Sequence, residues 1–238
     1  MTDVVLVHGA FHGGWCWAEV ANLLAAEGHR VLRPTLTGLA DRRHLLHASV
    51  DLQTHIDDIV ETIRYEELDD VVLVCHSVGG VPGIGAADRI TAKIGALVLL
   101  DAMIPIDGMS SSEVRDRSTA SWPMDLSGPT VTPPSSAVFG IPADRRAHID
   151  RLLTPQPVGT LVQPISLTGA FETIEVRQYH RFVGYEAAYM DESASRAASA
   201  GWTVRRHRCA HDMMLIDPAW TASLILAAVR DTAPTATP

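Results

Sequence analysis

Residues 71–80 read VVLVCHSVGG, and this stretch decides the fold. Residues 71–75 have the length and composition of a buried strand. Ser77 follows two positions later, and the two glycines after it favour a sharp turn into a helix. In the pattern small-x-Ser-x-small, here with Cys75 and Gly79 as the small residues, such a turn lifts the serine hydroxyl clear of the sheet. The stretch therefore indicates an α/β sheet with Ser77 as a candidate nucleophile.

The composition fits a globular protein with a substantial core. The chain has 238 residues, of which 47% are hydrophobic. A formal net charge of −9 argues against nucleic acid or an anionic membrane surface as a partner. No apolar run approaches the ~18 residues of a membrane span, and no export signal is evident. Three cysteines make no paired framework, so we expect a reduced, cytoplasmic setting, with a homodimer left open.

Short apolar strands alternate with amphipathic helices along most of the chain. Several strands are apolar on both faces, which is typical of a mostly parallel sheet covered by helices on both sides. We therefore predict an α/β core made of residues 1–102 and 177–231. Its strands are expected at 4–7, 30–33, 71–75, 96–100, 179–183 and 203–208, and its helices at 19–27, 52–68, 192–200 and 218–229, with a glycine-rich one ending near residue 90.

Residues 103–176 interrupt this alternation. They hold most of the fourteen prolines and only short helical candidates, such as residues 143–153. Because ligands bind outside the carboxyl ends of parallel strands, we expect this segment to be a cap insertion over those ends. Residues 232–238 alternate Thr, Ala and Pro, and are expected to form a flexible tail.

The base is expected to be a histidine. Serine is a poor nucleophile unless a base and an orienting acid stand behind it, and in this architecture the chain order is Ser, acid, His. Of eleven histidines, His211 falls just after the last predicted strand, at the same sheet edge as Ser77. His180 and His207 fall inside strands and are expected to be structural, and His76 is expected to point away from the site.

The acid should follow the strand at 179–183. Glu186 lies there, 25 residues before His211, and we predict it as the acid. Asp101, at the end of the preceding sheet strand, is an alternative that reaches the same edge. Asp191 is a weaker one, because it has the sequence position of a helix N-cap.

Acyl transfer also develops an oxyanion, which requires backbone N–H donors already in place. One is expected from Val78, at the N-terminus of the helix after the serine, and another from the glycine-rich loop at 8–15. His8 and His12 in that loop have a metal-like spacing, but no third ligand is evident. We therefore predict no metal and no cofactor.

Together these motifs resemble the α/β-hydrolases, and within them the plant methylesterase and hydroxynitrile lyase family with its bacterial esterase relatives. The stretches that carry the resemblance are HGAFHGGW at 8–15, ADR at 40–42, CHSVGG at 75–80 and AHDMML at 210–215. The resemblance implies a six-stranded sheet, with Ser77 as nucleophile, His211 as base and the N–H groups of Ala10 and Val78 as oxyanion donors. It also implies an aspartate as the acid, where the matching stretch offers Glu186.

The resemblance further implies a serine esterase. Hydroxynitrile lyases of the family have a threonine and a lysine where this chain has Gly9 and Asp212, so a lyase reaction is not favoured. We expect a small, largely apolar ester substrate with an apolar or aromatic acyl group; a small-molecule receptor on the same fold is the alternative. The candidates to line an apolar pocket are Phe11, Met103, Ile104, Trp122, Phe139 and Met213.

Overall fold

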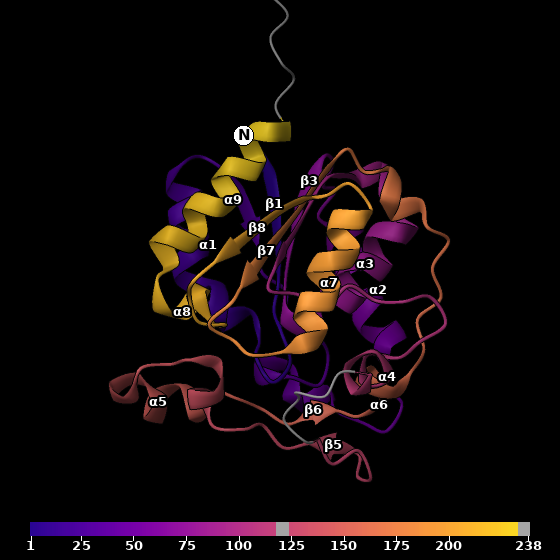
Figure 1. Ribbon diagram of the computed structural model, residues 1–238, viewed down its shortest axis with the longest axis vertical. Helices are drawn as coiled ribbons and strands as arrows, with labels where there is room; N and C mark the ends of the chain where they lie inside the picture. The colour runs from indigo at the N-terminus through magenta and orange to yellow at the C-terminus, as the bar shows by residue number, and fades with distance from the viewer. Residues whose placement is uncertain (118–123, 233–238) are drawn as a thin grey trace, which may run out of the picture.

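The computed structural model describes residues 1–117 and 124–232 and is built on one six-stranded sheet (Figure 1). The strand order is β2-β1-β3-β4-β7-β8, and all neighbouring strands are parallel. This confirms the predicted sheet. Its strands are β1 (Asp3–Val7), β2 (Arg30–Leu32), β3 (Val71–His76), β4 (Ile94–Leu100), β7 (Val176–Phe182) and β8 (Thr203–His207).

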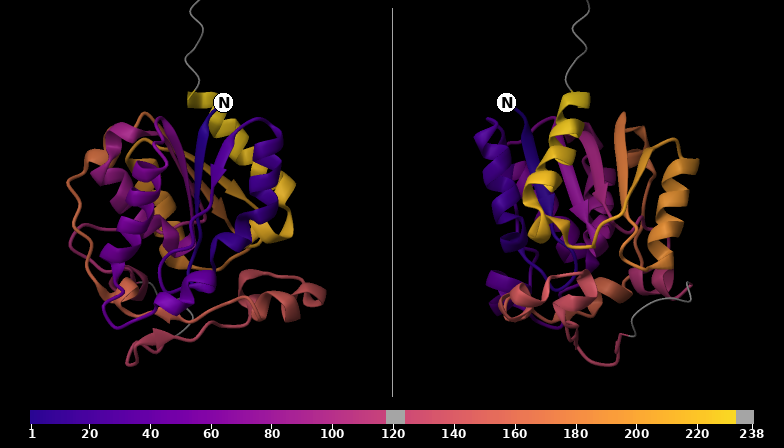
Figure 2. Two further views of the ribbon diagram at one scale, coloured as in Figure 1. Left: turned by 180° about the vertical axis from the view of Figure 1, so that it is seen from behind. Right: turned by 60° about the vertical axis from the view of Figure 1, so that its left-hand side comes forward.

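Helices cover both faces of the sheet (Figures 1 and 2). One face carries α1 (Ala18–Ala26) and α9 (Pro218–Thr232), and the other carries α2 (Leu52–Tyr65), α3 (Gly80–Arg89) and α7 (Ala188–Ser199). Strand β3 shows why both faces must be apolar: Leu73 packs into the core beside α2 and α3, whereas Val74 packs into the core beside α1 and α9.

Most predicted elements are found within a few residues of the expected bounds, but α7 begins earlier than expected. Its first residue is Ala188 and its N-cap is Ala187, so Asp191 lies within the first turn. The prediction of Asp191 as an N-cap is therefore wrong. Its carboxylate binds two arginines, Arg181 and Arg206, instead of the free N–H groups of the helix.

The short helices and strands from α4 (Ser111–Asp116) to α6 (Gly159–Val162), between β4 and β7, lie across the carboxyl ends of the sheet strands (Figures 1 and 2). Residues of this segment contact the loop after β1, where the Thr154 N–H donates to the Phe11 carbonyl oxygen at 2.9 Å. Between α4 and α6 the segment contains β5 (Thr130–Val131), α5 (Ala143–Asp150) and β6 (Gln156–Pro157), and β5 pairs with β6 in antiparallel fashion.

Helix α9 closes the described chain at Thr232, so the expected tail at 232–238 starts inside this helix and otherwise lies outside the described residues. Within residues 1–117 and 124–232, the structure has no helix that combines the length and the apolar composition needed to cross a membrane.

Candidate active site

The turn after β3 presents Ser77 in a strained conformation. Ser77 has a φ of +55°, a left-handed value that costs free energy for a residue other than glycine. The turn is held tightly: a Cβ on Gly79 would lie 2.3 Å from the carbonyl oxygen of His8, and the Met103 N–H donates to the Ser77 carbonyl oxygen at 2.9 Å. The small residue predicted at position 79 is thus required by the backbone of the loop after β1.

His211 links Ser77 to a buried carboxylate. Its Nε2 lies 2.9 Å from Ser77 Oγ, and its Nδ1 lies 2.6 Å from Asp101 Oδ2. An ionised carboxylate only accepts hydrogen bonds, so Nδ1 carries the proton and Nε2 is left to accept from the serine hydroxyl. The arrangement matches the geometry of a Ser-His-Asp triad, in which Nε2 can take the proton of the nucleophile.

The carboxylate beside His211 is Asp101, and the prediction of Glu186 in that place is wrong. Glu186 is exposed in the turn after β7, and in the described part of the chain it makes no hydrogen bond or ion pair. Asp101 is fully buried. Strands β3 and β4 are neighbours, and their last residues, His76 and Leu100, pair with each other. Ser77 and Asp101 directly follow these two residues, so they lie side by side at the same edge of the sheet. The strand order therefore decides which acid lies beside His211.

A buried ion pair lies next to the triad. His12 Nε2 is 3.1 Å from Asp212 Oδ2, and both side chains are almost completely buried. Burial alone lowers the pKa of His12, but the charge and hydrogen bond of Asp212 outweigh it and raise that pKa. Burial likewise raises the pKa of Asp212, yet His12 and the neighbouring histidines bring it below its usual value. Both shifts favour the ionised form of the pair.

His76 does not point away from the site, as the sequence suggested. Its ring centroid is 4.4 Å from that of His211, and its Nε2 lies 3.2 Å from the His211 carbonyl oxygen, to which it can only donate. Burial, with a smaller contribution from His211, lowers the pKa of His76 well below its ordinary value, so this ring is neutral. Strand β3 continues through His76, one residue beyond its predicted end, and the His76 ring lies against that of His211.

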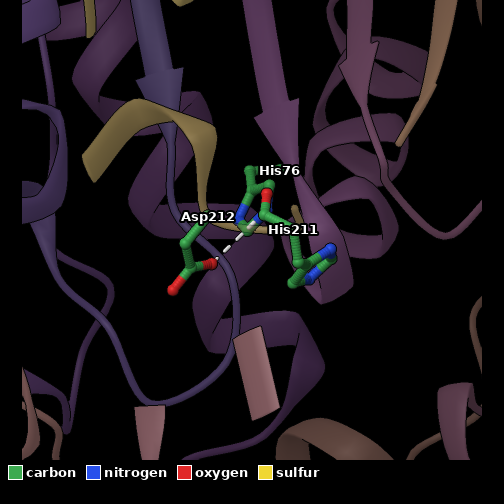
Figure 3. A group of neighbouring side chains, drawn as sticks. All are labelled: His76, His211 and Asp212. Atoms are coloured by element: carbon green, nitrogen blue, oxygen red, sulfur yellow. Dashed lines mark hydrogen bonds and ion pairs between the residues drawn. The ribbon is translucent and has the colours of Figure 1, made fainter. Parts of the chain in front are cut away.

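His76, His211 and Asp212 lie close enough together to resemble a metal site (Figure 3). One possible ligand atom from each lies within 4.8 Å of the other two. However, both ring nitrogens of His211 are already engaged, one with Ser77 and one with Asp101. A metal ion on His211 would have to replace one of those contacts, so the cluster fits the triad better than it fits a metal.

The histidine pair of the first loop is also committed to protein partners. His8 Nε2 accepts the N–H of Leu36 at 3.0 Å, and His8 Nδ1 lies 2.8 Å from the Gly9 carbonyl oxygen. Burial lowers the pKa of His8 to about 3, so this ring is neutral. His12 faces Ala10 and Asp212 instead. The absence of a metal and of a cofactor stays a prediction.

The two expected oxyanion donors both border the cavity beside Ser77. Within the described residues, the N–H groups of Ala10 and Val78 make no hydrogen bond. The peptide after Ala10 is held at both ends: His12 Nδ1 lies 2.7 Å from the Ala10 carbonyl oxygen, and the Phe11 N–H donates to Gln156 Oε1 at 3.1 Å. These contacts keep Phe11 at a φ of +69°.

The cavity beside Ser77 has a volume of about 50 Å³. Of the side chains predicted to line it, Phe11 and Phe139 do so. Met103 and Met213 do not, because both are buried in the cores that flank the sheet, and Ile104 borders a separate cavity near Trp202. Trp122 lies outside the described residues. The wall also includes side chains that the sequence did not single out: Arg115, Met124, Leu161, Tyr185 and Tyr189.

These missed residues had little signal in the sequence. Arg115, Met124 and Leu161 come from the segment between β4 and β7, which has no regular pattern. Tyr185 lies just after β7, and its ring stacks on His211 with centroids 4.1 Å apart. Its hydroxyl lies 3.4 Å from that of Tyr189. Because Tyr185 precedes the first residue of α7, helical spacing did not point to this pair.

The positions of Gly9 and Asp212 do not provide the groups that the hydroxynitrile lyases have there. A Cβ on Gly9 would lie 2.8 Å from Ser77 Cβ, so a threonine in this position would force the turn to move. Asp212 is a buried anion where the resemblance places a lysine. The site therefore lacks both the threonine and the lysine that the resemblance links to lyase activity.

The sequence matches the profile described as "Alpha/beta hydrolase family" over residues 4–231. It is 37% identical over 231 residues to a carbendazim hydrolyzing esterase from Nocardioides sp. (strain SG-4G), covering 92% of this chain and 96% of that protein. Over 106 residues it is 37% identical to methylesterase 9 of Arabidopsis thaliana, covering 44% of this chain and 41% of that protein.

A solved structure supports the same fold. An extracellular alpha/beta-hydrolase from a Paenibacillus species matches with a TM-score of 0.80 and 20% identity, over 96% of this chain and 99% of that one. The resemblance to methylesterases and bacterial esterases inferred from the motifs is thus confirmed. From its sequence profile, its parallel sheet and its serine turn, the chain belongs to the alpha/beta hydrolase family.

Proposed function

We propose that this chain is a serine esterase that cleaves a small, largely apolar carboxylic ester through an acyl-enzyme. The single observation that supports this most is the pair of hydrogen bonds that connects Ser77, His211 and Asp101. The broader class of activity is carboxylic ester hydrolysis. A relative that is 37% identical over nearly its full length is named an esterase.

The first half of the proposed reaction forms the acyl-enzyme. His211 Nε2 takes the proton of Ser77 as Oγ attacks the ester carbonyl carbon, and Asp101 stabilises the resulting imidazolium. The N–H groups of Ala10 and Val78 donate to the oxyanion that develops on the carbonyl oxygen. The tetrahedral intermediate then collapses, the C–O bond to the alcohol breaks, and His211 returns the proton to the leaving oxygen.

The second half releases the acid. His211 removes a proton from a water molecule, whose oxygen attacks the acyl carbon, and Ser77 Oγ leaves with the proton that His211 returns. Since every step uses the same base and the same oxyanion donors, the proposal requires no cofactor.

The cavity lining supports an apolar acyl group. Phe11, Met124, Phe139 and Leu161 supply apolar side chains beside Ser77, whereas Arg115 and the two tyrosines make one part of the wall polar. Such a lining suits a small apolar or aromatic group that carries one hydrogen-bonding function. A small-molecule ligand as the partner, a cytoplasmic location and a homodimer all stay predictions.

A fluorophosphonate probe separates an esterase from a receptor on the same fold. We expect stoichiometric phosphonylation of Ser77, located by peptide mass spectrometry, because the probe reacts with an activated serine beside oxyanion donors. The Ser77→Ala variant, with an unchanged circular dichroism spectrum, is the unlabelled control. A folded protein that stays unlabelled by several such probes would overturn the proposed function.

A further inference from the structure

Arg181 is a buried cation bound to the side of Asp101 that faces away from His211. Arg181 Nη1 donates to Asp101 Oδ1 at 2.9 Å, and the two side chains are 2% and 0% exposed. The Phe182 N–H donates to the same oxygen at 3.0 Å. With Oδ1 engaged in this way, Oδ2 is directed to His211. The acid of the triad is therefore held by a full positive charge.

The other edge of the Arg181 guanidinium binds Asp191. The distances are 3.2 Å from Nε to Oδ1 and 3.0 Å from Nη2 to Oδ2, a bidentate arrangement. Asp191 is 46% exposed and also accepts from Arg206 Nη1 at 2.7 Å. Alternating charges thus extend from the solvent at Arg206, through Asp191 and Arg181, to Asp101.

Arg181 stays charged in this setting. Burial alone lowers its pKa, but the hydrogen bonds and charges of Asp191 and Asp101 outweigh burial and raise it. Its remaining donors reach the carbonyl oxygens of Phe182 and Tyr185. A guanidinium with five donors in a rigid fork fixes the orientation of the carboxylate it binds.

A cation at this place has an electrostatic consequence. A triad aspartate favours the imidazolium form of its histidine, because opposite charges attract. Arg181 offsets part of the Asp101 charge, so it weakens that attraction. Asp191 in turn offsets part of the Arg181 charge from the far side. Removing Arg181 and removing Asp191 should therefore shift the protonation of His211 in opposite directions.

Other titratable groups also face His211. The Asp212 carboxylate is paired with His12, and the neutral ring of His76 lies 4.4 Å from that of His211. The Tyr185 ring stacks on the opposite side, and burial raises the pKa of its hydroxyl, so it stays uncharged. Arg115 borders the same cavity as His211. Within residues 1–117 and 124–232, Arg181 is the arginine that forms an ion pair with Asp101 itself.

We propose that Arg181 is a positioning residue of the triad, which directs Asp101 Oδ2 toward His211 and makes His211 easier to deprotonate. This inference rests on the proposed function, because it assigns the role through the esterase reaction. The expected consequence is that the pH dependence of the reaction changes when Arg181 is removed.

The test is the pH profile of kcat/KM for p-nitrophenyl acetate, whose acid limb reports the protonation of the base in the free enzyme. Arg181→Met should move the acid limb upward by about one pH unit, because the Asp101 charge is no longer offset. Arg181→Lys keeps the charge but loses the fork, so its limb should stay in place while kcat falls about tenfold.

A surface variant keeps the test decisive if Arg181→Met does not fold. Asp191→Asn changes a half-exposed side chain and should move the acid limb downward by about 0.3 pH units, since Arg181 is then less compensated. Glu186→Gln is the matched control: it removes an exposed carboxylate from the same turn region without touching Arg181, and its profile should be unchanged.

Two results are distinguishable. If the acid limb is unmoved in the folded Arg181→Met and Asp191→Asn variants while Ser77→Ala is inactive, the inference fails and the proposed function stands. If Ser77→Ala keeps full activity, the proposed function itself fails. A purely structural role for Arg181 would lower the melting temperature without moving the limb.

Discussion

Asp101 and His211 are joined by a hydrogen bond of 2.6 Å, although 110 positions separate them in the chain. The bond joins Asp101, which follows β4, to His211, which lies in the loop after β8. It is short, buried and charge-assisted, which makes it one of the stronger kinds of side-chain contact. The expected behaviour of several variants follows from it.

Replacing Ser77 by alanine should lower kcat for p-nitrophenyl esters by at least about 10³-fold, because no other group in the triad can form the acyl-enzyme. The fold should be retained, and the strain at the positive φ of Ser77 applies equally to alanine. Steady-state kinetics and thermal unfolding of the same preparation check both statements. Unchanged turnover would remove this hydroxyl from the reaction.

Asp101→Asn should lower kcat at pH 7 by roughly 10³- to 10⁴-fold, because an amide can hold the wrong histidine tautomer and cannot balance the imidazolium. Glu186→Gln should change kcat less than about twofold, since an exposed surface substitution away from the site has little effect. The comparison measures directly which carboxylate serves the triad. Equal losses in the two variants would contradict the geometry.

Gln156→Leu should lower kcat about tenfold with a smaller change in KM. It removes the Gln156 acceptor of the Phe11 N–H, and loss of a buried hydrogen bond costs about 1–3 kcal/mol. The loop can relieve this cost by a movement that displaces the neighbouring oxyanion donor. Gln163→Leu is the matched control. Gln163 belongs to the same segment and accepts the Gln53 N–H, but it does not line the cavity beside Ser77. If both variants lose activity equally, the effect is general destabilisation of the segment.

Stability should fall in mild acid because buried histidines are neutral. Burial lowers the pKa of His8 and, with smaller contributions from neighbouring charges, that of His180 to about 3. The unfolded chain binds protons at these rings below its ordinary pKa of 6.5, whereas the folded chain does not. Stability is thus full above pH 6.5 and declines as the pH falls from 6.5 toward 3, by about 2 kcal/mol for each histidine at pH 5.

Urea unfolding at pH 7 and at pH 5 measures this decline. His180→Gln should reduce the difference between the two pH values by about 2 kcal/mol, because one buried titrating ring is gone. His44→Gln, which changes an exposed histidine, is the control and should leave the difference as it was. A wild-type protein equally stable at both pH values would show that these rings are protonated in the folded state.

The layout of strands and helices could be predicted because it depends on local patterns. The apolar run at 71–75 can be satisfied only inside a sheet covered on both faces, and the glycines after Ser77 permit the tight turn that the structure shows. His211 was found by the same reasoning, because its loop follows the last strand of the sheet. These inferences used only spacing along the chain and residue type.

The identity of the acid could not be predicted in this way. Glu186 and Asp101 both follow sheet strands, and sequence spacing alone does not say which strand lies nearer to Ser77. The pairing of β4 directly against β3 places Asp101 beside the serine turn. The residues that line the cavity could not be predicted either. Arg115 and Leu161 come from a segment whose apolar residues follow neither helical nor strand spacing.

The amino-acid sequence by itself determined the parallel sheet, the sharp turn at Ser77 and the position of His211 at the same sheet edge. Only the tertiary structure decided that Asp101, backed by Arg181, is the carboxylate on His211. The physical reason is that backbone patterns act within a few residues, whereas a buried charge is stable only where folding brings an opposite charge from elsewhere in the chain.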